Sequence, residues 1–102
     1  MGEYIKVAKT SEISLGAVKY VEVQMNPIAL FNLDGFFYAI GNTCTHRGGP
    51  LAEGLIAGDE VTCPWHGARF KIPTGEVLGP PAPTGVAQYN LRVQGDDIEV
   101  EV

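Results

Sequence analysis

The amino-acid sequence predicts a small all-β domain. Short runs of β-branched and aromatic residues recur along the chain and are separated by Gly, Pro, Asn and Asp. Nowhere do apolar residues keep a 3.6-residue period for three full turns, so no long amphipathic helix is expected. A chain of 102 residues is large enough for one hydrophobic core and too small for two. We therefore expect residues 1–102 to form a single domain.

Eight strands are expected in chain order, and the turns between several of them are marked by residue type. The predicted strands are 4–8, 17–24, 28–33, 36–40, 60–63, 68–72, 88–93 and 98–102. Asp34-Gly35, between the third and the fourth, is a strong signal for a two-residue hairpin turn. Turns are also expected at Pro73-Thr74-Gly75 and at Gly95-Asp96-Asp97. Strands of this length with tight turns fit a small antiparallel sandwich or partly closed barrel.

Three segments depart from the strand pattern. Residues 41–51 and 64–67 are rich in Gly, Pro, Cys and His, which predicts two loops. Residues 79–83 read Gly-Pro-Pro-Ala-Pro and are too rich in proline for a central strand.

Charge and hydropathy exclude some functions. Twelve acidic and seven basic residues give a formal net charge of −5, and no run of Lys or Arg occurs, so we expect no nucleic-acid or anionic-membrane surface. An acidic protein instead favours partners with a basic docking face. The first residues lack a secretory leader, and no window approaches the about 18 apolar residues of a membrane-spanning helix. We therefore expect a soluble, cytoplasmic protein that acts as a monomer.

The two cysteines and two histidines of the chain fall within or directly beside the two loops, one of each per loop: Cys44 and His46, then Cys63 and His66. A disulfide between the cysteines is one interpretation, although a reducing cytoplasm argues against it. A Cys2His2 zinc site is a second, although zinc fingers usually place the cysteines in one pair and the histidines in another. The third is a cluster between the loops, with both thiolates on one iron and both imidazoles on the other, which is the Rieske arrangement.

The motif Cys-Thr-His followed by Cys-Pro-Trp-His-Gly resembles the Rieske ferredoxins that serve bacterial ring-hydroxylating and related oxygenases. The resemblance covers almost the whole chain, including residues 79–83, which in this family lie over the cluster. It implies a Rieske-type fold with a cluster-binding subdomain of two loops and one [2Fe–2S] cluster. It also implies that Cys44 and Cys63 bind the buried iron, and that His46 and His66 bind the outer iron through Nδ1 with Nε2 facing solvent.

The second loop also suggests a low reduction potential. High-potential respiratory members of the superfamily resemble this loop but have Cys, Ser and Tyr at the places of Trp65, Ala68 and Phe70, and a partner Cys at that of Gly49. Both hydroxyl donors and the disulfide that joins the loops are thus absent here. We therefore expect the low-potential class.

Other loop residues have more than one interpretation. Gly48, Gly49 and Gly67 either let backbone N–H groups approach the cluster sulfurs or simply occupy turns. Trp65 packs over the cluster, lines a docking face or belongs to the core. An apolar collar around the exposed imidazole edges is another hypothesis, with plain packing as the alternative; its members are Pro50, Leu51, Pro80 and Pro81.

The sequence favours a mobile one-electron carrier. It is expected to accept electrons from a flavin-dependent NAD(P)H ferredoxin reductase and to deliver them to a terminal oxygenase through the His46 and His66 edge. The alternative is a fixed iron–sulfur subunit of a larger oxidoreductase, which a large apolar face away from the cluster would favour. We expect no enzyme activity in the chain itself, because no further nucleophile–base motif remains once the cluster is bound.

Overall fold

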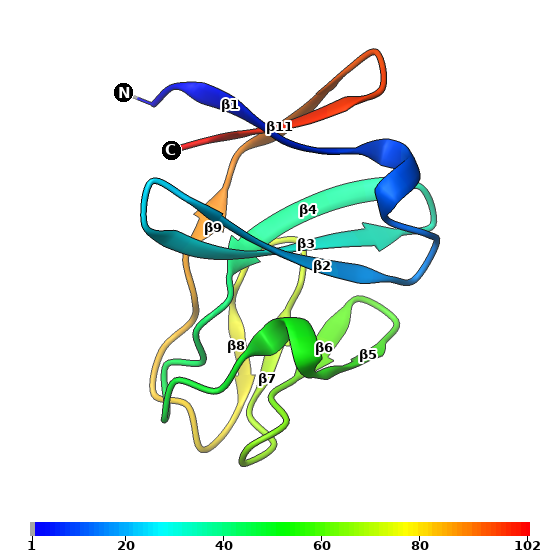
Figure 1. Ribbon diagram of the computed structural model, residues 1–102. Coiled ribbons are helices and arrows are strands. Elements are labelled where there is room, and N and C mark those ends of the chain that lie inside the picture. Colours follow the sequence, from blue (N-terminus) through cyan, green and yellow to red (C-terminus); the bar gives the residue numbers. More distant parts are fainter. Residues whose placement is uncertain (1) are drawn as a thin grey trace.

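The computed structural model describes residues 2–102, which contain eleven strands and two single-turn 3-10 helices (Figure 1). The first half contains β1 (Tyr4–Lys9), η1 (Thr10–Glu12), β2 (Val18–Val23), β3 (Asn26–Leu33), β4 (Phe36–Gly41) and η2 (Leu51–Glu53). The second half contains β5 (Leu55–Ala57), β6 (Glu60–Thr62), β7 (Arg69–Lys71), β8 (Val77–Gly79), β9 (Gln88–Tyr89), β10 (Leu91–Gln94) and β11 (Asp97–Glu101). The all-β prediction is confirmed.

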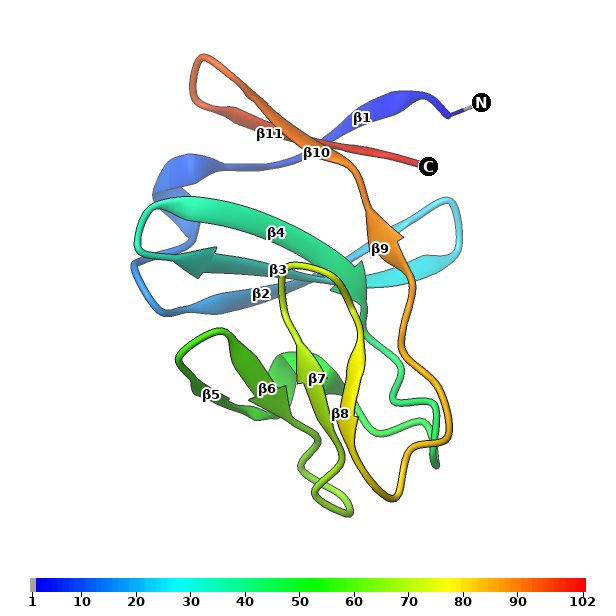
Figure 2. The same cartoon turned by 180° about the vertical axis from the view of Figure 1, so that it is seen from behind.

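The strands form three antiparallel sheets, with strand orders β1-β11-β10, β2-β3-β4-β9 and β5-β6-β7-β8. In Figure 1 the β2-β3-β4-β9 sheet lies between the other two, and the loops of the β5-β6-β7-β8 sheet reach the bottom of the molecule. The view from behind shows the turn between β7 and β8 reaching up toward β4 and β9 (Figure 2). There Gln88 Nε2 donates a 3.2 Å hydrogen bond to the Pro73 carbonyl, which ties the lower sheet to the middle one.

The predicted Asp34-Gly35 hairpin turn is confirmed. Both residues have positive φ, 55° and 91°, as a two-residue turn between twisted strands requires. The buried Asn32 side chain holds this turn: its Oδ1 accepts from the Gly35 N–H and its Nδ2 donates to the Ile13 carbonyl, each at 2.8 Å. A buried amide with partners for both groups fixes the connection before β2 against the β3–β4 turn.

The strand predictions differ from the structure in several strands of the second half of the chain. β5 and β8 were not expected, because three residues are too few to show an alternating pattern. The predicted strand 88–93 is divided at Asn90 into β9 and β10, which belong to different sheets. β7 is shorter than the predicted strand 68–72.

The buried apolar residues form two clusters, so the expectation of a single core was wrong. Successive side chains of a strand point to opposite faces, and both faces of the central strand β3 are covered. Ile28 and Leu30 therefore belong to the cluster shared with β1 and β11, while Ala29 and Phe31 belong to the cluster on the opposite face. Cys44 and Cys63 are members of that second cluster, beside the β5-β6-β7-β8 sheet.

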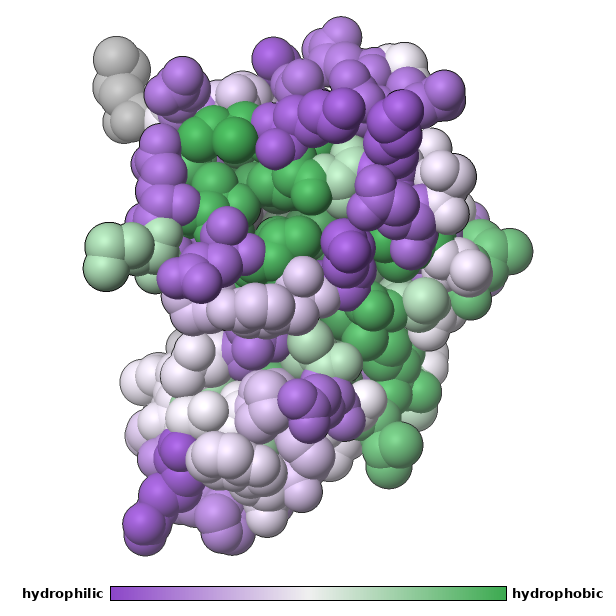
Figure 3. All heavy atoms as spheres, in the orientation of Figure 1, coloured by the Kyte–Doolittle hydropathy of each residue, from purple (hydrophilic) through white to green (hydrophobic). Residues whose placement is uncertain are grey.

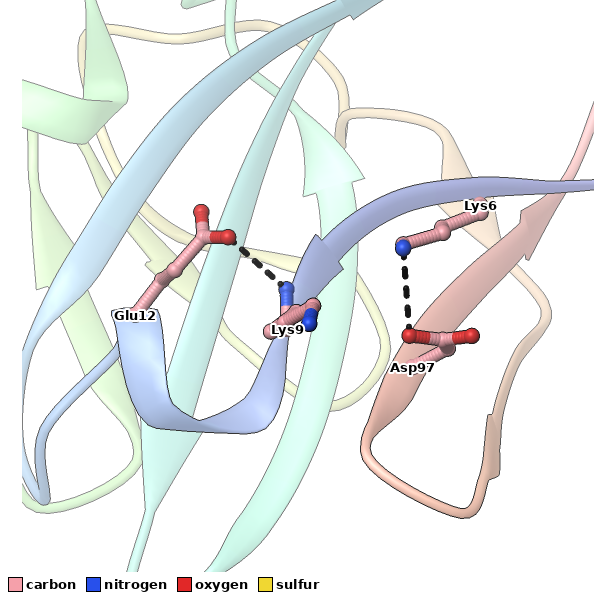
Figure 4. A network of polar contacts seen from close by, with 4 residues as sticks. All are labelled: Lys6, Lys9, Glu12 and Asp97. Carbon is pink, nitrogen blue, oxygen red and sulfur yellow. Dashed lines mark hydrogen bonds and ion pairs between the residues drawn. The ribbon is translucent and has the colours of Figure 1, made fainter.

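A polar network at the other end of the molecule holds β1 and η1 in place (Figure 4). The Lys9 N–H donates to the Glu12 carboxylate at 3.2 Å, and the Lys6 ammonium lies 3.3 Å from the Asp97 carboxylate on β11. The Lys6–Asp97 ion pair is exposed, and such a pair contributes about 0–1 kcal/mol. The two contacts join β1 to η1 and to β11, away from the two cysteine-containing loops.

Candidate metal centre

The loop between β4 and η2 is closed by two backbone hydrogen bonds around Cys44. The Cys44 N–H donates to the Gly49 carbonyl at 2.9 Å, and the Gly48 N–H donates to the Cys44 carbonyl at 2.8 Å. Gly48 has a φ of +78°, a conformation in which a side chain is strained. This closed turn directs the Cys44 side chain inward and carries His46 at its tip.

The loop between β6 and β7 repeats this construction around Cys63. The Cys63 N–H donates to the Ala68 carbonyl at 2.7 Å, and the Gly67 N–H donates to the Cys63 carbonyl at 3.2 Å, with a φ of +79° at Gly67. The two loops therefore share the same sequence offsets of five and four residues. Because the N–H groups of Gly48 and Gly67 are bonded to carbonyls, the turn interpretation of these two glycines is the one that the structure supports.

The two cysteines are free thiols and are almost completely buried, with 2% and 3% of their surfaces exposed. Burial raises the pKa of the Cys44 thiol, and the neighbouring Cys63 raises it further, while backbone N–H groups of His46 and Arg47 that bond to its sulfur lower it. Such N–H groups stabilise a thiolate once a metal replaces the proton. The structure contains no disulfide between Cys44 and Cys63, so it does not support the disulfide interpretation.

The two histidines lie side by side, with ring centroids 4.9 Å apart and an angle of 84° between the ring planes. Among the described residues, His46 Nδ1 is the one buried side-chain nitrogen or oxygen without a hydrogen-bond partner. Burial lowers the pKa of His46, and the nearby His66 and Arg47 lower it further. The neutral imidazole, which is the metal-binding form, is therefore favoured at this position.

The donors form two pairs rather than one group of four. In the described part of the chain no three side chains of His, Cys, Asp or Glu are grouped closely enough to hold a single metal ion. A mononuclear zinc site would need all four donors around one ion. A two-iron cluster needs a buried thiolate pair and a separate imidazole pair, and the buried, unpartnered His46 Nδ1 fits such a ligand.

Burial of the residues around the loops corrects one member of the collar hypothesis. Pro80 and Pro81, joined by a cis peptide bond, are exposed, and Pro50 is half-buried. Leu51 has no exposed surface and belongs to the core, so its place in the collar was wrong. It is the first residue of η2, which turns its side chain inward under the loop.

The sequence did not single out Thr45 as a structural residue. Its hydroxyl donates a 2.6 Å hydrogen bond to the Thr84 carbonyl and so ties the first loop to the segment that follows the prolines. The two residues are 39 positions apart, and no local pattern predicts such a contact. The position of Thr45 between Cys44 and His46 was the one available signal.

An antiparallel all-β domain with two matching loops that present one thiol pair and one imidazole pair is a Rieske-type protein. The family model for the Rieske [2Fe-2S] domain matches residues 3–90. The chain therefore belongs to the Rieske [2Fe–2S] domain family and binds one [2Fe–2S] cluster.

Several known proteins of similar sequence and structure are ferredoxins. The chain is 30% identical over 100 residues to the ferredoxin component of the naphthalene 1,2-dioxygenase system of Pseudomonas aeruginosa, covering 98% of this chain and 96% of the relative. Its structure is similar to the ferredoxin of carbazole 1,9a-dioxygenase from Nocardioides aromaticivorans IC177, with a TM-score of 0.91, 27% identity and 95% of each chain covered. A ferredoxin solved in the complex of reduced oxygenase and oxidized ferredoxin in carbazole 1,9a-dioxygenase is also similar, with a TM-score of 0.89, 31% identity, and 95% of this chain and 91% of that chain covered.

These findings define an electron carrier of the Rieske ferredoxin class, which is an electron-transfer component and not itself an enzyme. Neither of the two helices among residues 2–102 has the length and apolar character needed to cross a membrane.

Proposed function

We propose that the chain is a mobile one-electron carrier and that Cys44, His46, Cys63 and His66 hold its cluster. The two cysteines are the ligands of the inner iron, and the two histidines are the ligands of the outer iron through Nδ1. The observation that carries this assignment is the division of the four donors into a buried thiol pair and a paired set of imidazoles, with His46 Nδ1 buried and unpartnered.

The bound cluster supplies reversible one-electron chemistry at a potential within roughly −150 to +300 mV. The residues around it determine where the electron enters and leaves. Cys44 and Cys63 are buried, whereas His66 is exposed and His46 is half-buried. The two imidazoles therefore provide the short path between the inside of the domain and a docked partner. All four ligand positions belong to the protein, so no position remains open for a substrate.

The partners in this proposal are a flavin-dependent ferredoxin reductase and a terminal oxygenase. Relatives named as ferredoxin components of dioxygenase systems support it, as does the solved complex of an oxygenase with a ferredoxin of this fold. The net charge of −5 suits partners with basic docking faces and does not suit nucleic acid or an anionic membrane. We place the carrier in the cytoplasm as a soluble monomer, with residues 1–102 as one Rieske domain.

Electron exchange with purified partners tests this proposal. The holoprotein, reduced anaerobically by NADH and a flavin-dependent ferredoxin reductase, should be reoxidised by a Rieske-type terminal oxygenase with its substrate present. Both half-reactions are followed by the visible absorption of the cluster. A holoprotein that neither a panel of such reductases nor chemical mediators can reduce reversibly by one electron would contradict the proposal.

An apolar strip away from the ligand loops favours a second candidate, the fixed electron-transfer subunit of a larger oxidoreductase. Leu15, Phe36 and Leu55 are 71%, 68% and 77% exposed. Figure 3 shows apolar side chains along the right-hand edge, from the β3–β4 turn down to β5, with paler, more polar atoms between the upper and lower ones. Beside these residues lies a hollow of about 330 Å³, lined by Gly16, Leu33, Asp34, Ile56 and Gly58. Exposed apolar surface of this kind often marks a lasting protein contact.

The mass of the native assembly separates the two candidates. Light scattering after co-expression with the chain's own reductase and oxygenase genes should give the mass of the free carrier, with partners in separate fractions. A stable complex of fixed stoichiometry would instead establish the fixed subunit, provided that the strip holds it together. In that case Phe36→Asp disrupts the complex, and Met25→Asp at the exposed β2–β3 turn does not. Met25 is the matched control because it is 87% exposed and lies outside the strip.

A further inference from the structure

Gly49 lies at the point where the two ligand loops meet. It is buried in the first loop, and its carbonyl accepts the hydrogen bond from the Cys44 N–H. A Cβ atom at this position would lie 2.6 Å from Cys63 Sγ and 3.1 Å from Cγ and Cδ2 of Trp65. Both of those residues belong to the second loop. The Cys63 sulfur and the Trp65 indole thus contact the same face of one glycine.

Glycine is required here by space and not by backbone conformation. Gly48 and Gly67 have φ near +78°, where any side chain is strained, yet a Cβ at Gly67 would meet no atom within 4 Å. Gly49 shows the reverse, since its φ is outside that range and a side chain would overlap two groups of the other loop. The absence of a side chain at Gly49 therefore serves the contact between the loops.

The Trp65 indole covers this contact from the outside. Trp65 is 55% exposed, while the Cys63 residue beneath it is 3% exposed and Gly49 is buried. An indole with one side against Gly49 and the other toward solvent excludes water from the sulfur next to it. Water near a cluster sulfur donates hydrogen bonds and stabilises the more negative, reduced state, which raises the potential.

We propose that Trp65, seated on Gly49, is a positioning residue that holds the two ligand loops together and keeps water from the Cys63 sulfur. This inference rests on the proposed function, because it takes Cys63 as a cluster ligand. Loss of the indole then has two linked consequences. The cluster becomes more accessible to an iron chelator, and its reduction potential shifts to a more positive value.

Two measurements on purified holoprotein test the inference. The first is the midpoint reduction potential, measured by voltammetry. The second is the rate at which the cluster's visible absorption is lost to excess ferrozine, an iron chelator, under reducing, anaerobic conditions. Trp65→Gly should raise the potential and speed cluster loss several-fold. Trp65→Phe keeps an aromatic ring against Gly49. Its reduction potential and its rate of cluster loss should therefore stay close to the wild-type values. Because Trp65 is half-exposed, neither change is expected to prevent folding.

Gly49→Ala tests the other side of the contact, and Gly58→Ala is its control. The added methyl group at residue 49 should displace the indole and shift both readouts in the direction of Trp65→Gly. Gly58 has a φ of +61° and open space around it, so Gly58→Ala strains the backbone far from the loops and should change neither readout.

Unchanged potential and unchanged chelation rate in Trp65→Gly would overturn the inference, and so would a Trp65→Phe variant that behaves like Trp65→Gly. If Gly49→Ala fails to assemble a cluster, the two Trp65 variants decide the matter. Wild-type iron content and the electron paramagnetic resonance of the reduced protein are measured first. A wild-type protein without a Rieske signal would contradict the proposed function itself, whereas a normal wild-type signal with insensitive variants would contradict only this inference.

Discussion

The hydroxyl of Thr45 donates a 2.6 Å hydrogen bond to the carbonyl of Thr84. This bond connects the loop that contains Cys44 and His46 with the segment that follows Pro80 and Pro81, two parts of the chain that are far apart in sequence. The position of the proline segment relative to the first ligand loop therefore depends on this link.

Replacing Thr45 should loosen that link without removing a ligand. Thr45→Val loses one hydrogen bond at a partly exposed site, which costs about 0.5–1.5 kcal/mol of stability. The thermal midpoint of the holoprotein should fall by a few degrees, and Thr45→Ser should retain most of it. Thr43→Val is the matched control, since Thr43 is an exposed residue of the same loop. An equal fall in the Thr43 variant would show that the hydroxyl of Thr45 has no special role.

The reduction potential should lie in the lower part of the Rieske range, below about 0 mV, because the loops lack hydroxyl donors to the cluster. Ala68 and Phe70 are both fully buried beside the thiol pair. A hydroxyl introduced by Ala68→Ser or Phe70→Tyr finds few polar partners there other than the cluster sulfurs, so each change should raise the potential in voltammetry.

A buried serine elsewhere separates this effect from a general loss of stability. Ala39→Ser places a hydroxyl in the other apolar cluster, on the opposite face of the middle sheet. It should destabilise the fold and leave the potential unchanged. A wild-type potential near the upper end of the range would refute the low-potential assignment.

Partners should dock at the end of the molecule that carries His46, His66 and the exposed prolines. A charge at the centre of a small, transient interface costs a large share of its affinity. Pro81→Glu should therefore slow stopped-flow reduction by a flavin-dependent ferredoxin reductase that reduces the wild-type protein, with iron content unchanged. Met25→Glu, at the exposed β2–β3 turn, should react at the wild-type rate. Normal reduction of the Pro81 variant would place the docking face elsewhere.

The fold was predictable where residue type alone determines a conformation. Asp34-Gly35 has the residues that a tight hairpin turn prefers, and the structure has that turn. The β2–β3 turn was not predicted, because Gln24 and Met25 take φ values of 50° and 68° although neither residue type favours them. That turn is imposed by the pairing of β2 with β3 along six residue pairs.

The sequence predicts the residue types of the proposed site but not their surroundings. Cysteine and histidine at fixed spacing identify metal-binding chemistry from sequence alone. The burial of Leu51 and the contact of Gly49 with Trp65 depend on how the loops pack, which no local pattern contains. Leu51→Asp is for this reason expected to unfold the domain rather than to disturb a docking face, since it buries an unpaired charge.

Metal and sulfide analysis of freshly purified protein from iron-replete cells tests the central claim most directly. The account predicts about two irons and two acid-labile sulfides per chain, lost together in Cys44→Ser and in His66→Ala because each loop supplies half of the ligands. Stoichiometric zinc without visible absorption from iron, or a complete cluster in either ligand variant, would contradict it.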